Sequence, residues 1–154
     1  MSILNLQNTV SIISYSIIVV ALLLGQSTVQ AASNPELAVV IEQGDNALAA
    51  GQLDTALASF QKAAEIKPDT EQVQHKLASV YLLKGEYANS IQYFHKTLGF
   101  NAKNSKAFIG LSLAYLHTGQ YALAKAALDE AKLYSDKTED IDKILDWIKS
   151  KQQH

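Results

Sequence analysis

The sequence repeats itself at a constant interval of 34 residues, and this repeat constrains the fold more than any other feature of the chain. Gly51, Gly85 and Gly119 occupy the same place in three consecutive segments, and no insertion or deletion is needed to align them. The three units are 37–70, 71–104 and 105–138. One unit of this length cannot bury its own apolar face, so neighbouring units are expected to stack into one continuous core.

Each unit is predicted to consist of two helices joined by a turn at the shared glycine. On both sides of Gly119, mostly apolar residues recur at the three- and four-residue spacing of one helical face. They are Phe108, Leu111, Ser112 and Tyr115 before the glycine, and Tyr121, Ala124, Leu128 and Ala131 after it. The small residues let the helices approach closely and the larger ones fill the space between them. We therefore expect an all-α fold.

The chain resembles the tetratricopeptide repeat (TPR) family over residues 37–138, about two-thirds of its length. Three units in phase at this interval make the resemblance specific for the fold and much less informative about function. The third unit carries the family pattern at Phe108, Leu111, Tyr115, Gly119, Tyr121, Ala124 and Ala131. The resemblance implies a right-handed α-solenoid of three helix-turn-helix units within residues 33–138.

Residues 139–154 do not begin a fourth unit and are predicted to form a capping helix and a tail. An apolar stripe is expected to face the last repeat, and it consists of Ile141, Ile144, Leu145 and Ile148. Charged residues lie on the other side, as the outer face of a terminal repeat requires. Trp147 flanks the stripe, and it suits either a lid packed on the last repeat or a docking residue.

The first helix of each unit is also apolar on the side opposite to its core stripe, where an ordinary surface helix is polar. The TPR resemblance places this side on the concave face of the solenoid. The predicted groove residues are Ile41, Asp45, Leu48, His75, Ser79, Leu82, Leu83, Lys106, Ile109, Leu113, Leu116 and His117. We expect this groove to bind an apolar or amphipathic protein segment, unless the capping helix or the N-terminal segment fills it.

One well-defined TPR subclass grips the C-termini of chaperones through a carboxylate clamp of Lys, Asn and Arg residues. In this sequence only Lys106 matches that clamp. Ile41 and Asp45 stand where the first unit should give Lys and Asn, Lys76 replaces the Asn of the second unit, and Gly110 replaces the Arg. The sequence therefore argues against a chaperone adaptor of the clamp type.

The N-terminal stretch carries no charged side chain before Glu36 and contains an apolar run over residues 10–25. The small residues of Val29-Gln30-Ala31 suit a signal-peptidase site. Residues 1–32 are therefore predicted to be a signal peptide, cleaved after Ala31 or Ala32, or an uncleaved signal anchor. The mature protein is expected to be periplasmic or secreted in the first case, and to be held at the membrane by residues 10–25 in the second.

Composition excludes several classes of function. Net charge is −2 and all 13 basic residues are lysines, so a nucleic-acid-binding surface is not expected. Without cysteine there is no disulfide, thiolate nucleophile or cysteine-based zinc site. No enzyme motif is present, and the four histidines lack carboxylates at metal-ligand spacing. We therefore expect no catalytic activity, no bound metal and no cofactor.

These observations together predict a non-catalytic protein-interaction adaptor. The resemblance to exported bacterial TPR proteins implies a role in assembling an envelope complex. The alternative is a structural scaffold that assembles with itself, in which the groove of one molecule accepts the capping helix or the N-terminal segment of another.

Overall fold

The computed structural model describes residues 34–136 and 138–151, and within them the chain forms seven α-helices and no strand. The helices are α2 (Pro35–Ala49), α3 (Leu53–Ile66), α4 (Glu71–Leu83), α5 (Tyr87–Phe100), α6 (Ser105–His117), α7 (Tyr121–Leu133) and α8 (Glu139–Lys151). The packing described below lies within the unit that begins at Val39. The predicted N-terminal signal segment, residues 1–32, lies outside the described residues.

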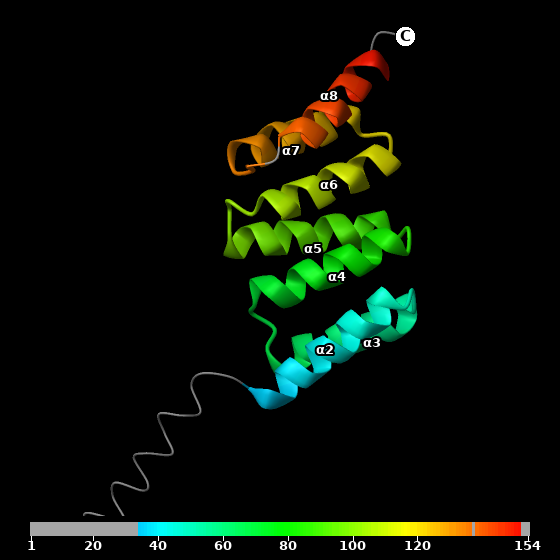
Figure 1. Cartoon of the computed structure of the whole chain (residues 1–154), viewed down its shortest axis with the longest axis vertical. Coiled ribbons are helices and arrows are strands. Elements are labelled where there is room, and N and C mark those ends of the chain that lie inside the picture. Colours follow the sequence, from blue (N-terminus) through cyan, green and yellow to red (C-terminus); the bar gives the residue numbers. More distant parts are fainter. Residues whose placement is uncertain (1–33, 137, 152–154) are drawn as a thin grey trace, which may run out of the picture. The chain divides into compact units, whose positions relative to one another are not determined.

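Successive helices pack against one another from α3 to α8, and α4 also contacts α6 directly (Figure 1). This second contact joins the first helices of two neighbouring units, as stacking of helix pairs requires. The predicted all-α solenoid of helix pairs is confirmed. Within the described residues, no helix has the length and apolar character that crossing a membrane would demand.

The three glycines at the 34-residue interval end the first helix of each pair. Gly51, Gly85 and Gly119 have φ angles of 72°, 76° and 73°, in the left-handed region that disfavours residues with a Cβ atom. The amide that follows each glycine donates back to the last turn of the helix, for example from Gln120 to the Tyr115 carbonyl at 2.8 Å. This is the Schellman pattern, so the repeated glycine is explained by backbone geometry.

Side-chain caps begin α2, α4 and α6. The Asn34 side chain accepts from the amides of Glu36 and Leu37, and the Asn104 side chain accepts from the Ala107 amide at 2.9 Å. Thr70 does the same for α4, with Val73 as the donor. These caps satisfy amides that the first turn of a helix leaves unpaired, so they fix where the first helix of each pair begins.

The second helices contribute to the core at the same three positions in every unit. These residues are Ala56, Phe60 and Ala63 in α3, Ser90, Phe94 and Thr97 in α5, and Ala124, Leu128 and Ala131 in α7, and all are buried. The two polar members are satisfied by backbone carbonyls, because Ser90 donates to Ala78 at 3.0 Å and Thr97 donates to Tyr93 at 3.0 Å. The units therefore tolerate Ser or Thr where the repeat pattern favours Ala.

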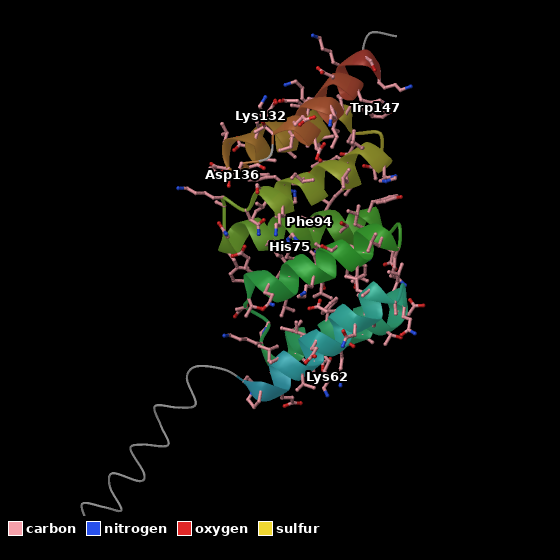
Figure 2. The ribbon with its side chains drawn as sticks, in the orientation of Figure 1. Lys62, His75, Phe94, Lys132, Asp136 and Trp147 are labelled. Atoms are coloured by element: carbon pink, nitrogen blue, oxygen red, sulfur yellow. The ribbon has the colours of Figure 1, made fainter. Side chains whose placement is uncertain are left out.

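The C-terminal helix α8 closes the last repeat through its apolar stripe. Ile141 and Ile148 are fully buried in a cluster with residues of α7, and Ile144 and Leu145 pack against the same cluster. Trp147 lies on α8 with its ring 6.2 Å from that of Tyr121, and its side chain stays 46% exposed (Figure 2). The stripe thus has the capping role predicted for it.

Candidate functional site: the outer side of the first helices

The predicted groove residues lie on α2, α4 and α6, and we call this set the groove face. Its members differ in exposure. Ile41 is buried, so its side chain belongs to the core, whereas Leu83 at the end of α4 is 60% exposed. Leu48, Ser79 and Leu113 are half-buried. The groove face is therefore a partly exposed aliphatic surface with its most open residue at the C-terminal end of α4.

Three aliphatic side chains of the groove face also pack inward. Leu82 contacts the cluster that contains Ala78 and Phe94, and Ile109 and Leu116 contact the cluster that α8 closes. These three residues therefore contribute to stability as well as to the surface. Leu83 and Leu113 are not part of either cluster, so they are the better probes of a binding role.

An ion pair joins the first and second units across this face. The Lys76 ammonium lies 2.5 Å from an Asp45 carboxylate oxygen and 5.4 Å from the centre of the Phe60 ring. Both charged side chains are partly exposed, so the pair contributes little net free energy. Its main consequence is to fix Asp45 and Lys76 against each other, which lowers the charge that either presents to a ligand.

A hollow of about 400 Å³ lies where α4 and α6 begin. Its lining residues are Glu71, Gln72, His75, Lys76, Asn104 and Lys106. Glu71 is held by two amide groups, from Asn101 at 3.1 Å and from Asn104 at 2.6 Å. Lys106 makes no ion pair among the described residues and is exposed, so it is the cation that this end of the groove face offers to an acidic group.

His75 packs beside this hollow in an environment that favours the neutral imidazole. Its ring lies edge-on to Phe94 at 5.6 Å (Figure 2). Its Nδ1 atom is buried and has no hydrogen-bond partner among the residues that the structure describes. Burial lowers the pKa of His75, and the positive charge of Lys106 acts in the same direction. His75 is therefore an uncharged residue of the groove face near neutral pH.

At the other end of the groove face, aromatic rings stack between successive units. His117 lies parallel to Tyr87 at 4.7 Å, with 5° between the ring planes. Tyr87 was not among the predicted groove residues, because it begins a second helix. The 34-residue interval contains the signal that would have found it, since Leu53, Tyr87 and Tyr121 occupy equivalent positions.

A second hollow of about 420 Å³ was also missed by the sequence prediction. It lies between the start of α4 and the end of α5, and its lining residues are Pro68, Asp69, Gln74, Lys96, Gly99 and Phe100. None of them belongs to the groove face. In the part of the chain that the structure describes, no three histidines or carboxylates gather in a way that could hold a metal ion.

Comparison with known families explains this arrangement of helices. A TPR repeat model matches residues 44–85, and a second tetratricopeptide repeat model matches residues 71–104 and 105–137. Together the matches cover more than half of the chain. The chain belongs to the tetratricopeptide repeat family. Curated relatives include the general transcriptional corepressor trfA of Dictyostelium discoideum, 28% identical over 91 residues. They also include tetratricopeptide repeat protein 37 of Xenopus laevis, 32% identical over 87 residues.

The matched segments are 59% and 56% of this TPR chain, but only 6% and 5% of those two relatives.

Solved TPR structures share the fold at low sequence identity. The first TPR domain of Spaghetti (RPAP3) bound to an HSP90 peptide has a TM-score of 0.75 at 16% identity, covering 79% of this chain and 97% of that one. The type III secretion translocator chaperone SycD of Yersinia enterocolitica has a TM-score of 0.73 at 19% identity, covering 79% and 98%.

The structure adds packing detail at the positions where the sequence lacks the residues of the carboxylate clamp. At Gly110, the clamp's Arg position, an added Cβ atom would lie 2.1 Å from the Phe94 ring. Lys76 and Asp45 are engaged with each other. Of the clamp positions, only Lys106 presents a cation that is free for a ligand.

Proposed function

We propose that this protein is a non-catalytic adaptor that binds an apolar or amphipathic protein segment on its groove face. The observation that carries the proposal is the exposure of Leu83, which is 60% exposed in a row of first-helix aliphatic residues. Leu83 continues the half-buried aliphatic residues Leu82, Leu113 and Leu116 of the same face. An apolar surface shared by neighbouring helices is typical of an interaction site, whereas a single exposed aliphatic residue is not.

The distribution of charge along the groove face suggests the chemistry of the ligand. Lys106 and the hollow beside it suit an acidic residue, while Leu83 and Leu113 suit apolar side chains. An amphipathic helix or an extended segment can present both kinds of side chain. Two of the similar structures support a peptide as the ligand in general, because one contains a bound HSP90 peptide and the other a bound peptide of the translocator YopD.

The test uses a charged substitution at the open end of the groove face. Leu83→Glu should abolish capture of the partner by the full-length protein in its native host, because a carboxylate would have to be buried against apolar side chains. Leu133→Glu is the matched control, since Leu133 is 70% exposed on α7 and lies outside the groove face. Both variants should keep the helical content of the original protein in circular dichroism.

The two variants separate the possible outcomes. Loss of the same dominant partner in Leu83→Glu, with its retention in Leu133→Glu, supports the adaptor function. Equal capture by both variants contradicts it, because the exposed aliphatic residue would then have no part in binding.

We also propose that residues 1–32 place the protein outside the cytoplasm or at the membrane, where it helps to assemble an envelope complex in a bacterial cell. The support is the uncharged N-terminal stretch, its apolar run at 10–25 and the small residues before Ala32. A fusion of alkaline phosphatase to the C-terminus should be active, since that enzyme folds only where disulfides form. N-terminal sequencing then distinguishes cleavage after Ala31 or Ala32 from a retained anchor. An inactive fusion would contradict the proposal.

A further inference from the structure

The hollow between α4 and α5 contains a buried polar atom without a partner. Gln74 is only 6% exposed, and its amide nitrogen donates to the Pro68 carbonyl at 2.7 Å. Its carbonyl oxygen, Oε1, is buried and accepts no hydrogen bond from any described residue. An unsatisfied buried acceptor is unfavourable, so a donor that entered the hollow and reached this oxygen would bind with added free energy.

The third repeat places an aromatic ring where the second has Gln74. Moving 34 residues along the chain replaces Gln74 and Phe100 by Phe108 and Tyr134, whose rings stack at 6.3 Å with 19° between their planes. In the second unit no ring takes the place of Phe108, and Phe100 is left 49% exposed. The hollow therefore lies where the third unit has an aromatic ring, whereas the first unit has Val40 and Ile66 at the two equivalent positions.

The chain carries one aromatic side chain with the complementary chemistry. Trp147, its only tryptophan, is 46% exposed on α8, and its indole N–H makes no hydrogen bond among the described residues. The indole N–H of Trp147 is a hydrogen-bond donor, and Oε1 of Gln74 is an acceptor, so the two unpaired groups are complementary. A half-exposed tryptophan is also the residue type that most often anchors a protein interface.

Charges around the two sites are complementary as well. Asp69 and Lys96 line the hollow, while Asp146 precedes Trp147 and Lys151 lies 5.7 Å from the Trp147 ring. Within the described ranges none of these four residues forms an ion pair. Lys96 can therefore pair with Asp146, and Asp69 can pair with Lys151.

We propose that the hollow is a docking site for Trp147 of a second copy of this chain. The contact cannot form within one molecule, because Ile141 and Ile148 hold α8 against α7 while the hollow lies between α4 and α5. Each copy both offers a tryptophan and accepts one. The contact therefore closes into a reciprocal dimer or continues into a chain of copies. It uses none of the groove-face residues, so it is independent of the proposed adaptor function.

The single tryptophan makes this proposal directly measurable. Excited at a wavelength that tyrosine does not absorb, the fluorescence of the full chain reports Trp147 alone. Its emission should shift to shorter wavelength as protein concentration rises and the ring leaves water. Sedimentation velocity over the same concentration series should show association with the same midpoint.

The matched variant is Gln74→Phe, which fills the hollow as Phe108 does in the third unit and preserves the helix. It should weaken association at least tenfold and abolish the concentration-dependent shift of Trp147 emission. Trp147→Ala should weaken association equally in sedimentation. Phe100→Ala, which removes the exposed ring on the opposite wall of the hollow, should weaken it several-fold.

A charge exchange tests the orientation of the two copies without filling the hollow. Lys96→Glu or Asp146→Lys alone should weaken association a few-fold, and the two changes in one chain should restore it. Sedimentation as a monomer at all concentrations would overturn the proposal. Association that persists in both Gln74→Phe and Trp147→Ala would also overturn it, because another surface would then join the copies.

Discussion

The second and third repeat units share a backbone but fill equivalent positions differently. Phe94 in the second unit corresponds to Leu128 in the third, and Lys76 corresponds to Gly110. The large ring of Phe94 packs directly on Gly110 of the following helix. The ring therefore occupies the space that a side chain at position 110 would take. The comparison shows that the repeat interval determines where helices lie, while pairs of residues in neighbouring units determine how tightly they pack.

The largest effect is expected from giving Gly110 a side chain. In Gly110→Ala the new Cβ atom would lie 2.1 Å from the Phe94 ring, so α5 and α6 would have to move apart. We expect the free energy of unfolding to fall by about 3 kcal/mol, measured by urea denaturation. Adding Phe94→Leu, which copies Leu128, should recover part of the loss. A double variant no more stable than Gly110→Ala would show that the two positions are not coupled.

A smaller effect is expected from making the third unit resemble the second. Phe108→Gln removes the ring that stacks on Tyr134 and places an amide where Gln74 lies in the second unit. Because Phe108 is half-buried, the free energy of unfolding should fall by about 2 kcal/mol. Thermal unfolding followed by circular dichroism measures this change. No change in stability would contradict the view that the ring fills this place.

Sequence alone predicted the elements that depend on periodicity. The repeat interval and the helical spacing of apolar residues gave the helix pairs, the core positions and the capping stripe of α8. It did not predict the hollow beside Gln74, because that hollow depends on how a side chain of α4 meets the end of α5. It likewise could not show that Ile41 is buried or that Leu82, Ile109 and Leu116 pack inward. Those outcomes depend on the rotation of each helix against its neighbours.

The turns allow a sharper comparison between two glycines in different conformations. Gly119→Ala should lower the free energy of unfolding by about 1 kcal/mol, since φ is 73° there and an L-residue is strained. Gly99 lies within α5, where an added Cβ atom meets nothing within 4 Å. Gly99→Ala should instead raise stability by about 0.5 kcal/mol. Urea denaturation of both variants checks the signs, and equal signs would contradict the explanation of the repeated glycine.

The smallest expected effect concerns pH. His75 corresponds to Ile109 in the third unit, and its pKa in the folded protein is lowered, chiefly by burial. The unfolded chain therefore binds a proton more readily, so this residue destabilises the fold as pH falls through about 6.5 and has no such effect above it. His75→Ile should reduce the loss of thermal stability between pH 7.5 and pH 5.5. An unchanged pH dependence would exclude His75 as its source.

We propose above that the groove face binds a partner at the C-terminal end of α4, where Leu83 is exposed. The most direct test places a photo-crosslinking residue at position 83 or at position 133 of the full-length protein in living cells of its native host. We expect one dominant foreign protein to be crosslinked from position 83 and to be absent from position 133, although Leu133 is the more exposed of the two. Equal crosslinking from both positions, or none from position 83, would contradict it.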